Sequence, residues 1–319
     1  MTAETVKNNC RIENKKGNAM LKNIKKHRYL LLMLTPGLLY FVIFRYIPIY
    51  GVLMAFQDYS LKYGVLGSKW VGLKHFISLF SGGDFQLVLK NTVLISFLKI
   101  ICGFPAPIIL ALLFNELKDG YYKKITQTIS YAPHFFSWVV VSGMLTSLLS
   151  PSVGMVNKII QALGGQPIYF LADKNWFVQI IIMSDIWKEV GWGSIIYLAA
   201  LAGINYEMHE AAVIDGASRI KRMVYINIPN ILPTIATMLI LRMGSLLDAG
   251  FDQIFNLESV AVRDVSDIID TYVYRMGVGS FQYSFASAAG LFKSVIGIAM
   301  VLLTNRIARR LSDGESSIW

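Results

Sequence analysis

The sequence predicts an all-α protein that crosses a membrane with six helices. Hydrophobic residues make up 55% of its 319 residues and charged residues only 16%, whereas soluble domains usually carry about a quarter charged residues. The mean hydropathy of +0.51 agrees with this composition. A helix needs roughly 20 residues to cross a bilayer core of about 30 Å, and six separate apolar segments reach that length.

The six segments follow one another along the chain and are joined by more polar loops. The predicted spans are Tyr29–Ala55, Leu87–Phe114, Ile129–Leu149, Phe177–Leu201, Ile231–Gln253 and Phe285–Ile307. Pro133 and His134 lie near the start of the third segment, which therefore fits an uninterrupted span less well than the other five. Gly103, Pro105 and Pro107 are expected to kink the second. Such kinks help to form transport cavities but also occur in passive membrane helices, and the sequence leaves both readings open.

Basic residues around the spans predict the orientation of the chain in the membrane. The cluster KNIKKHR at residues 22–28 precedes the first span, and Arg306, Arg309 and Arg310 follow the last. Basic residues that flank spans stay on the cytoplasmic side. The chain is therefore expected in the cytoplasmic membrane with both termini in the cytoplasm. A signal peptide would open in the same way, but no small-residue cleavage site follows the first apolar run.

The predicted organisation is a membrane domain between two cytoplasmic tails. The tails are residues 1–28 and 308–319, and the membrane domain is residues 29–307. The first 21 residues are polar and lack apolar periodicity, which predicts disorder. Cys10 and Cys102 lie far apart, without metal-ligand or disulfide-framework spacing, and are interpreted as unpaired thiols.

Several function classes are excluded by the absence of their motifs. The sequence contains no G-x-x-x-x-G-K-[ST] phosphate loop, no zinc-ligand spacing and no G-x-S-x-G nucleophile elbow. The net charge of +10 would suggest a nucleic-acid partner in a soluble chain. Here the basic residues flank membrane spans instead, so no nucleic-acid partner is expected. The chain is therefore expected to bind no cofactor and to be no enzyme, and to draw energy from a partner or from an ion gradient.

A charged stretch, EAAVIDGASRIKRMVYINIP, occupies the predicted cytoplasmic loop at residues 205–230 between the fourth and fifth spans. Asn205 is a plausible N-cap for a first short helix. Gly216 permits a turn that a β-carbon would resist, and Pro229 is expected to end a second short helix. The loop is thus predicted to be a helix–glycine–helix hairpin exposed in the cytoplasm. By itself such a hairpin could be a mere connector.

The spacing within this loop is more specific than a connector requires. Glu-Ala-Ala, three residues, Gly, nine residues, Ile, one residue, an apolar residue and Pro fit Glu210, Ala211, Ala212, Gly216, Ile226, Ile228 and Pro229. This pattern resembles the EAA motif of permease subunits in binding-protein-dependent ABC importers. The usual leucine before the proline is Ile228 here. The resemblance implies that the loop docks into a cleft on a cytosolic ATPase.

The resemblance extends over nearly the whole chain after the N-terminal tail. The stretches NTVLISFLKIICGFPAPIILALLFNE, SYAPHFFSWVVVSGML and SDIWKEVGWGSIIYLAALAGI are similar to the MalF-like sugar permeases, especially the polysaccharide or oligosaccharide branch. It implies a MetI/MalF-like permease fold and a carbohydrate substrate. It also implies a second permease, two ATPase subunits that use ATP and Mg, and an extracellular solute-binding protein. The lipid bilayer is the remaining partner.

Polar residues inside the predicted spans are candidates for the substrate pathway, because charges at mid-membrane usually face a cavity or a partner. The charged members are Lys99, Asp185, Lys188, Glu189, Arg242, Asp248, Asp252 and Lys293. Aromatic rings can stack on sugar rings and carboxylates can accept hydrogen bonds from hydroxyls. The candidate pathway is therefore Asp185, Trp187, Lys188, Glu189, Trp192, Asp248, Phe251 and Asp252. The alternative is structural: Lys188 and Glu189 could pair with Asp185 or Arg242, and Trp187 could be core packing.

Two other functions can be weighed against the residues inside the predicted spans. An ion-coupled secondary transporter could use Lys99, Asp185 and Glu189 as a relay, although the paired inverted repeats of broken helices typical of such folds are not visible. A membrane-bound enzyme would need a metal or nucleophile constellation that the sequence lacks.

Overall fold

The structure is a computed structural model that describes residues 26–311 of the chain. Most of the predicted N-terminal tail, Cys10, the side chains of Arg309 and Arg310, and residues 312–319 lie outside the described residues. The described part is almost entirely helical, with one short two-stranded hairpin. The prediction of an all-α protein is confirmed in this part of the chain.

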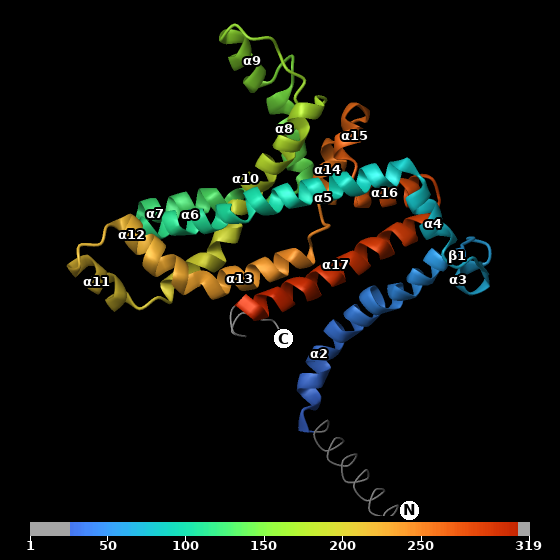
Figure 1. Ribbon diagram of the computed structural model, residues 1–319, viewed down its shortest axis with the longest axis horizontal. Coiled ribbons are helices and arrows are strands. Elements are labelled where there is room, and N and C mark those ends of the chain that lie inside the picture. Colours follow the sequence, from blue (N-terminus) through green and yellow to red (C-terminus); the bar gives the residue numbers. More distant parts are fainter. Residues whose placement is uncertain (1–25, 312–319) are drawn as a thin grey trace, which may run out of the picture.

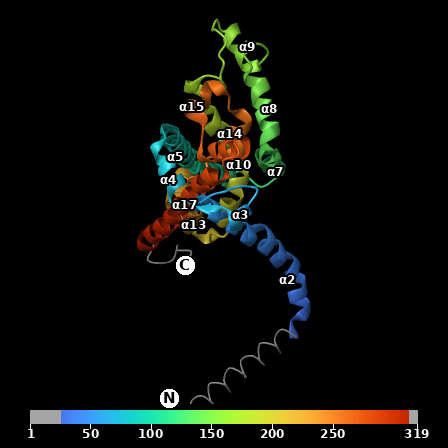
Figure 2. The same cartoon turned by 90° about the vertical axis from the view of Figure 1, so that its right-hand side faces the viewer.

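The long helices are α2 (Arg28–Phe41), α5 (Gly83–Gly103), α6 (Pro105–Glu116), α7 (Tyr121–Tyr131), α8 (Trp138–Leu149), α10 (Lys174–Ala202), α13 (Ile228–Gly244) and α17 (Tyr283–Leu311). Most of them pack into one bundle, but α2 extends away from it and has no buried residue. Helix α10 packs against α5, α6 and α13, while α13 packs along α17. Helix α8 projects from this bundle at the end where α10 begins, as Figures 1 and 2 show.

Shorter elements connect the long helices. They are η1 (Val42–Tyr46), η2 (Ile47–Phe56), β1 (Gln57–Asp58), α3 (Gly64–Gly67), β2 (Lys69–Trp70), α4 (Lys74–Ser81), η3 (Ala132–Phe135), α9 (Met155–Ala162), α11 (Tyr206–Ile214), α12 (Arg219–Arg222), η4 (Met223–Asn227), α14 (Phe251–Leu257), η5 (Val260–Val262), α15 (Arg263–Ser266), α16 (Ile269–Tyr274) and η6 (Arg275–Gly279). Helices α14, α15 and α16 lie between α13 and α17 in the sequence and fold back onto the bundle: α14 contacts α8, and α16 contacts α17.

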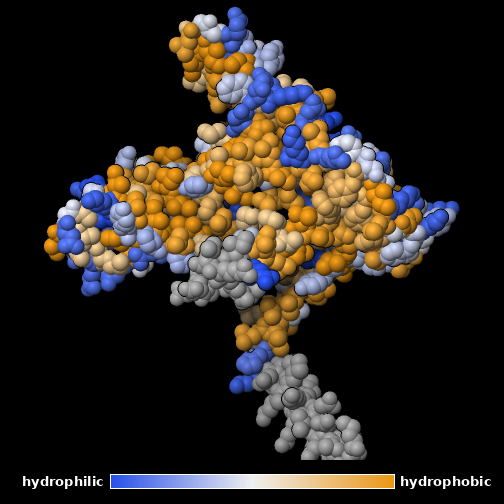
Figure 3. Space-filling model, viewed as in Figure 1, coloured by the Kyte–Doolittle hydropathy of each residue, from blue (hydrophilic) through white to orange (hydrophobic). Residues whose placement is uncertain are grey.

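The candidate membrane spans are identified by helix length and apolar composition. Within the described residues, four helical stretches are long and apolar enough to cross a membrane: Arg28–Phe56, Gly83–Glu116, Arg219–Gly244 and Tyr283–Arg306. Figure 3 shows apolar residues over much of the visible face of the bundle. Helix α10 has 29 residues and is long enough, but Asp185, Lys188 and Glu189 reduce its apolar character. A multi-pass helical protein is therefore established, whereas the number six stays a prediction.

The third predicted span, Ile129–Leu149, is wrong as a single helix. Helices α7 and α8 meet at an angle of 102°. Pro133 lies in the one-turn 3-10 helix η3, where it cannot donate a backbone hydrogen bond to continue α7. Ser137 then begins α8 as its N-cap, and its hydroxyl accepts a hydrogen bond of 3.4 Å from the Val140 N–H. The bent pair counts as a fifth span if both halves enter the membrane.

The fifth predicted span, Ile231–Gln253, is also wrong at its end. Helix α13 stops at Gly244, nine residues early, and a new helix begins at Phe251. Gly250 has a φ of +94°, a conformation that non-glycine residues rarely adopt. The chain therefore turns between the two helices. By contrast, the prolines of the second span only interrupt the helix at Phe104, and Gly83–Glu116 remains one candidate span.

The hairpin that follows the first span is held by charged side chains. Strands β1 and β2 pair antiparallel, with Asp58 opposite Lys69. The carboxylate of Asp58 accepts a hydrogen bond of 2.9 Å from Lys74 Nζ and lies 3.2 Å from His75 Nε2. The hydrogen bond from Lys74 lowers the pKa of Asp58 below its ordinary value.

Gly191 sets the closest approach between α7 and α10. A β-carbon at this position would lie 1.9 Å from the backbone oxygen of Ser130, so the two helices would have to separate. We expect Gly191→Ala to destabilise the protein by about 1–3 kcal/mol, the usual cost of overpacking. The measurement is thermal unfolding in detergent. Gly143→Ala is the matched control, because a β-carbon at Gly143 on α8 meets no described heavy atom within 4 Å. Equal stability of the two variants would contradict this packing.

Candidate functional site

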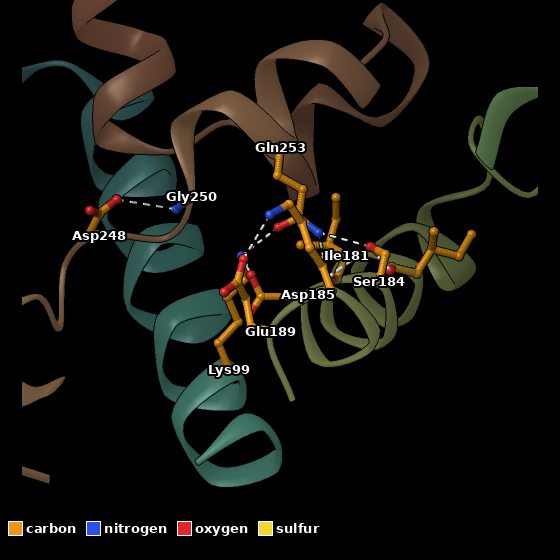
Figure 4. Close-up of polar contacts among 10 residues, drawn as sticks. Lys99, Ile181, Ser184, Asp185, Glu189, Asp248, Gly250 and Gln253 are labelled. Atoms are coloured by element: carbon orange, nitrogen blue, oxygen red, sulfur yellow. Dashed lines mark hydrogen bonds and ion pairs between the residues drawn. The ribbon is translucent and has the colours of Figure 1, made fainter. Parts of the chain in front are cut away.

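A buried polar cluster joins three helices in the middle of the bundle. Lys99 of α5 places its Nζ 3.0 Å from Asp185 Oδ1 of α10 and 2.5 Å from Gln253 Oε1 of α14. The Gln253 amide nitrogen donates to the Ile181 carbonyl at 2.7 Å and to Ser184 Oγ at 2.9 Å. The Lys99 side chain is only 3% exposed. Figure 4 shows the side chains converging between the three helices.

Gly250 completes this cluster by leaving room for the lysine. A β-carbon at Gly250 would lie 2.7 Å from Lys99 Nζ, so any other residue would push the ammonium out of place. Asp185 was predicted in the substrate pathway, and here it neutralises a buried lysine. The sequence missed Gln253 as its partner, because this glutamine was assigned to the end of a straight fifth span.

A second polar cluster lies further along α10. Glu189 accepts a hydrogen bond of 3.0 Å from Lys188 Nζ and contacts His134 Nδ1 at 2.8 Å. The imidazole of His134 stacks on the indole of Trp192 at 4.5 Å between ring centroids. Lys188 also donates to the His134 carbonyl. Glu189 remains 42% exposed, so its carboxylate and the Trp192 ring are accessible to a ligand while Lys188 is buried.

The partners of this cluster differ from those the sequence suggested. Lys188 and Glu189 pair with each other and with His134 rather than with Asp185 or Arg242. His134 was noted only as a helix-breaking neighbour of Pro133. The break in the third span is what brings its imidazole to α10, so no sequence spacing could have indicated this contact.

The other predicted pathway residues lie in two further places. Trp187 lines a mostly apolar groove of about 980 Å³ between α8 and α10 together with Met144 and Met183. Asp248 and Phe251 line a different cavity, of about 640 Å³, near α16 and α17. Asp252 is exposed in the first turn of α14. The eight residues therefore do not form one site, and whether any of them contacts substrate stays a prediction.

The stretch with the EAA spacing forms α11, a turn and α12 at one end of the molecule, as Figure 1 shows. The Asn205 side chain caps α11 by accepting from the Glu207 N–H at 3.0 Å. Gly216 has a φ of +73° and makes the turn. Glu210 and Ala211 are exposed and Ala212 is partly exposed, and the neighbouring Ile214 is 85% exposed. Val213 and Ile220 of the same hairpin are also exposed, and several exposed apolar side chains in one place suit a protein interface.

Pro229 does not end a second short helix, as the sequence had suggested. It lies at the second position of α13, directly after the π turn η4, and the helix continues through it. Ile226 lies in the single π turn η4, which joins α12 directly to α13. The second arm of the hairpin is therefore the start of the span Arg219–Gly244.

Comparisons with known proteins agree with this arrangement. A family model described as binding-protein-dependent transport system inner membrane component matches residues 103–313. Protein LplB of Bacillus subtilis (strain 168) is 46% identical over 93% of this chain and 94% of its own. The polygalacturonan/rhamnogalacturonan transport system permease protein YteP of the same organism is 42% identical over 96% and 95%.

A solved structure has a similar fold. A chain from the crystal structure of a bacterial ABC transporter involved in the import of the acidic polysaccharide alginate has a TM-score of 0.86 and 41% identity, covering 92% of this chain and 99% of that one. The chain belongs to the family of binding-protein-dependent transport system inner membrane components, and is a transport permease rather than an enzyme.

Proposed function

We propose that this chain is one permease subunit of an ATP-driven importer that translocates an oligosaccharide. The observation that carries the proposal is its similarity, over more than nine-tenths of its length, to permeases whose names specify polysaccharide transport. The exposed aromatic and carboxylate side chains along α10 suit hydroxyl-rich substrates. The substrate arrives on an extracellular solute-binding protein. A crystal structure of the alginate transporter, in complex with an alginate pentasaccharide-bound periplasmic protein, supports this partner.

The turn between α11 and α12 is the proposed coupling element. Two cytosolic ATPase subunits, which use ATP and Mg, would close against this turn in the chain and in a second, homologous permease. The α12 arm runs through η4 into α13 without a break in the chain of helical turns. Movement of the turn would therefore be transmitted along one continuous helix into the membrane. The spans would then change between inward-open and outward-open states.

The proposed function also implies how the chain is oriented in the membrane. Helices α11 and α12 would face the cytoplasm, with Glu210, Ala211, Ala212 and Gly216 at the ATPase. Both termini would lie on that side of the cytoplasmic membrane, with six spans between them. The hairpin of β1 and β2 and the helices α14–α16 would lie toward the exterior, where the binding protein docks.

Reconstitution of the purified transporter tests this function. A P-loop ATPase and a second permease are expected to copurify with the chain. Adding the sugar-loaded binding protein should then stimulate ATP hydrolysis in proteoliposomes. The proposal fails if sugar uptake continues without ATP and instead stops when the proton or sodium gradient is dissipated, because that result would indicate ion-coupled transport.

A further inference from the structure

Helix α5 carries a groove that belongs neither to the polar clusters of α10 nor to the α11–α12 turn. Its volume is about 490 Å³, and all of its lining residues come from α5: Gln86, Leu89, Lys90, Val93, Leu94 and Phe97. Side chains at this three- and four-residue spacing share one face of a helix. This surface is called the α5 groove below.

The α5 groove faces away from the rest of the chain. Val93, Leu94 and Phe97 are 48%, 44% and 54% exposed. The buried residues of α5 lie on its other side, against the bundle: Phe85, Val88, Asn91, Thr92, Ile95, Ser96 and Lys99. Because α5 is the first part of the candidate span Gly83–Glu116, the exposed side meets either lipid or another membrane subunit.

The groove has a polar end and an apolar end. Gln86 and Lys90 lie toward the start of α5, and the apolar residues Val93, Leu94 and Phe97 follow toward the middle of the span. The Gln86 amide nitrogen donates a hydrogen bond of 3.3 Å to the Phe80 carbonyl of α4. Within residues 26–311, Lys90 has no hydrogen-bond or ion-pair partner. Its ammonium therefore lacks a counter-ion from the described part of the chain.

The length of the span places Lys90 at the boundary of the hydrocarbon core. The 34 residues of Gly83–Glu116 extend about 51 Å as a helix, whereas the core is about 30 Å thick. A centred span therefore emerges by about 10 Å at each end. Lys90 lies about 10 Å along the helix from Gly83, and Phe97 lies about 10 Å deeper. The lysine can thus extend to the headgroups, while Phe97 lies among the acyl chains.

A phospholipid supplies what both ends of the groove need. At the depth of Lys90 its phosphate is an anionic acceptor for the ammonium, and its acyl chain can cover Val93, Leu94 and Phe97. Asp84, the acidic residue at the start of α5, lies about 120° around the helix from Lys90. A protein subunit in the same groove would have to bring a carboxylate to the headgroup level, whereas every phospholipid has its phosphate there.

We propose that the α5 groove binds one anionic phospholipid, with its phosphate on Lys90 and an acyl chain along Val93, Leu94 and Phe97. A zwitterionic phosphatidylcholine binds less well, because its quaternary ammonium repels the lysine. In the proposed orientation α5 begins at the exterior end, so the lipid belongs to the outer leaflet. The lipid contact itself depends neither on that orientation nor on the proposed transport function.

Photo-cross-linking at Phe97 tests the site in the complex as purified. p-Benzoylphenylalanine takes the place of Phe97, and the complex is reconstituted in nanodiscs of phosphatidylglycerol and phosphatidylcholine in equal amounts. Mass spectrometry of the adducts should show phosphatidylglycerol in about fivefold excess, which corresponds to roughly 1 kcal/mol for one lysine near the membrane surface.

The same label at Ile298 is the matched control. Ile298 is 61% exposed on α17, and no basic residue lies within one turn of it in the sequence. Its adducts should therefore contain the two lipids in their bulk ratio. An equal ratio at Phe97 as well would overturn the site.

Variants of Lys90 show whether its charge selects the lipid. Lys90→Met should reduce the excess at Phe97 to the ratio found at Ile298, whereas Lys90→Arg should keep it, because a guanidinium also pairs with phosphate. Lys69→Met should leave the excess unchanged, since Lys69 is exposed but lies on β2, outside the candidate spans. An undiminished excess in Lys90→Met would overturn the proposal.

The protein adducts of the Phe97 label give a further test. If the label reacts chiefly with another subunit of the complex, the groove is a subunit interface and the proposed lipid site is wrong. Failure of an ATPase to copurify would instead contradict the proposed transport function, and the lipid excess at Phe97 should persist in that case.

Discussion

Lys99→Met is expected to destabilise the folded permease by about 3–5 kcal/mol, the usual cost of removing one partner of a buried ion pair. Lys99 is almost fully buried and pairs with Asp185, whose side chain is 18% exposed. Without the ammonium, the Asp185 carboxylate would lose its counter-ion and Gln253 would lose its hydrogen-bond donor. The midpoint of thermal unfolding in detergent measures the effect, and the yield of monodisperse protein should fall with it.

The double variant Lys99→Met/Asp185→Leu is the matched control for this prediction. Replacing both members of a buried pair by apolar residues of similar size is often neutral. We therefore expect the double variant to be more stable than Lys99→Met alone. If the single variant unfolds at the wild-type temperature, or if the double variant is less stable than the single one, the ion pair does not hold α5, α10 and α14 together.

Gly216→Val is expected to abolish sugar uptake and to release the ATPase from the complex. The backbone at Gly216 has a φ of +73°, which is a genuine outlier for a β-branched residue. The left-handed conformation costs such a residue roughly 1–2 kcal/mol. The exposed turn can avoid this cost by changing its conformation, which would reorient α11 relative to α12. Copurification of the ATPase and uptake in vesicles are the two measurements.

Gly216→Asn distinguishes backbone conformation from the mere presence of a side chain. Asparagine tolerates the left-handed region better than valine does, and open space surrounds the position in the described residues. We expect the asparagine variant to retain a substantial part of uptake and ATPase association. Equal loss in both variants would indicate that the ATPase contacts Gly216 directly. Full activity of the valine variant would remove the turn from the coupling mechanism.

Local sequence patterns predicted the α11–α12 turn well. Asn205 caps α11 and Gly216 turns the chain, because both effects depend only on a residue and its immediate neighbours. Pro229 was misassigned for a related reason. A proline is compatible with the end of one helix and with the first turn of the next, and only the continuity of α12, η4 and α13 decides between them.

The polar contacts inside the bundle could not be predicted in the same way. The sequence indicated the helix of the fourth predicted span and its charged residues, but not their partners. Lys99 meets Asp185 where α5 packs on α10, and it meets Gln253 because the chain breaks after Gly244 and α14 folds back against α10. Likewise His134 reaches Glu189 because the third span bends by 102°. The contacts of Gln253 and His134 both depend on helix breaks inside apolar segments, and hydropathy alone does not reveal such breaks.

Family membership also decides between the transport mechanisms left open by the sequence. An ion relay through Lys99, Asp185 and Glu189 would need these groups to share one path. The structure instead places Asp185 with Lys99 and Gln253, and Glu189 with His134 and Lys188. These contacts are structural pairings, and the family match is what favours a permease whose energy comes from partner subunits.

Cross-linking of the α11–α12 turn tests the coupling role most directly. Ile214→Cys, in a Cys10→Ser/Cys102→Ser background, puts a thiol at a position that is 85% exposed in the isolated chain. In the assembled transporter this thiol is expected to cross-link to the ATPase subunit and to resist impermeant reagents added outside intact cells. Labelling from the exterior, or an assembled transporter without any cross-link to the ATPase, would contradict the account.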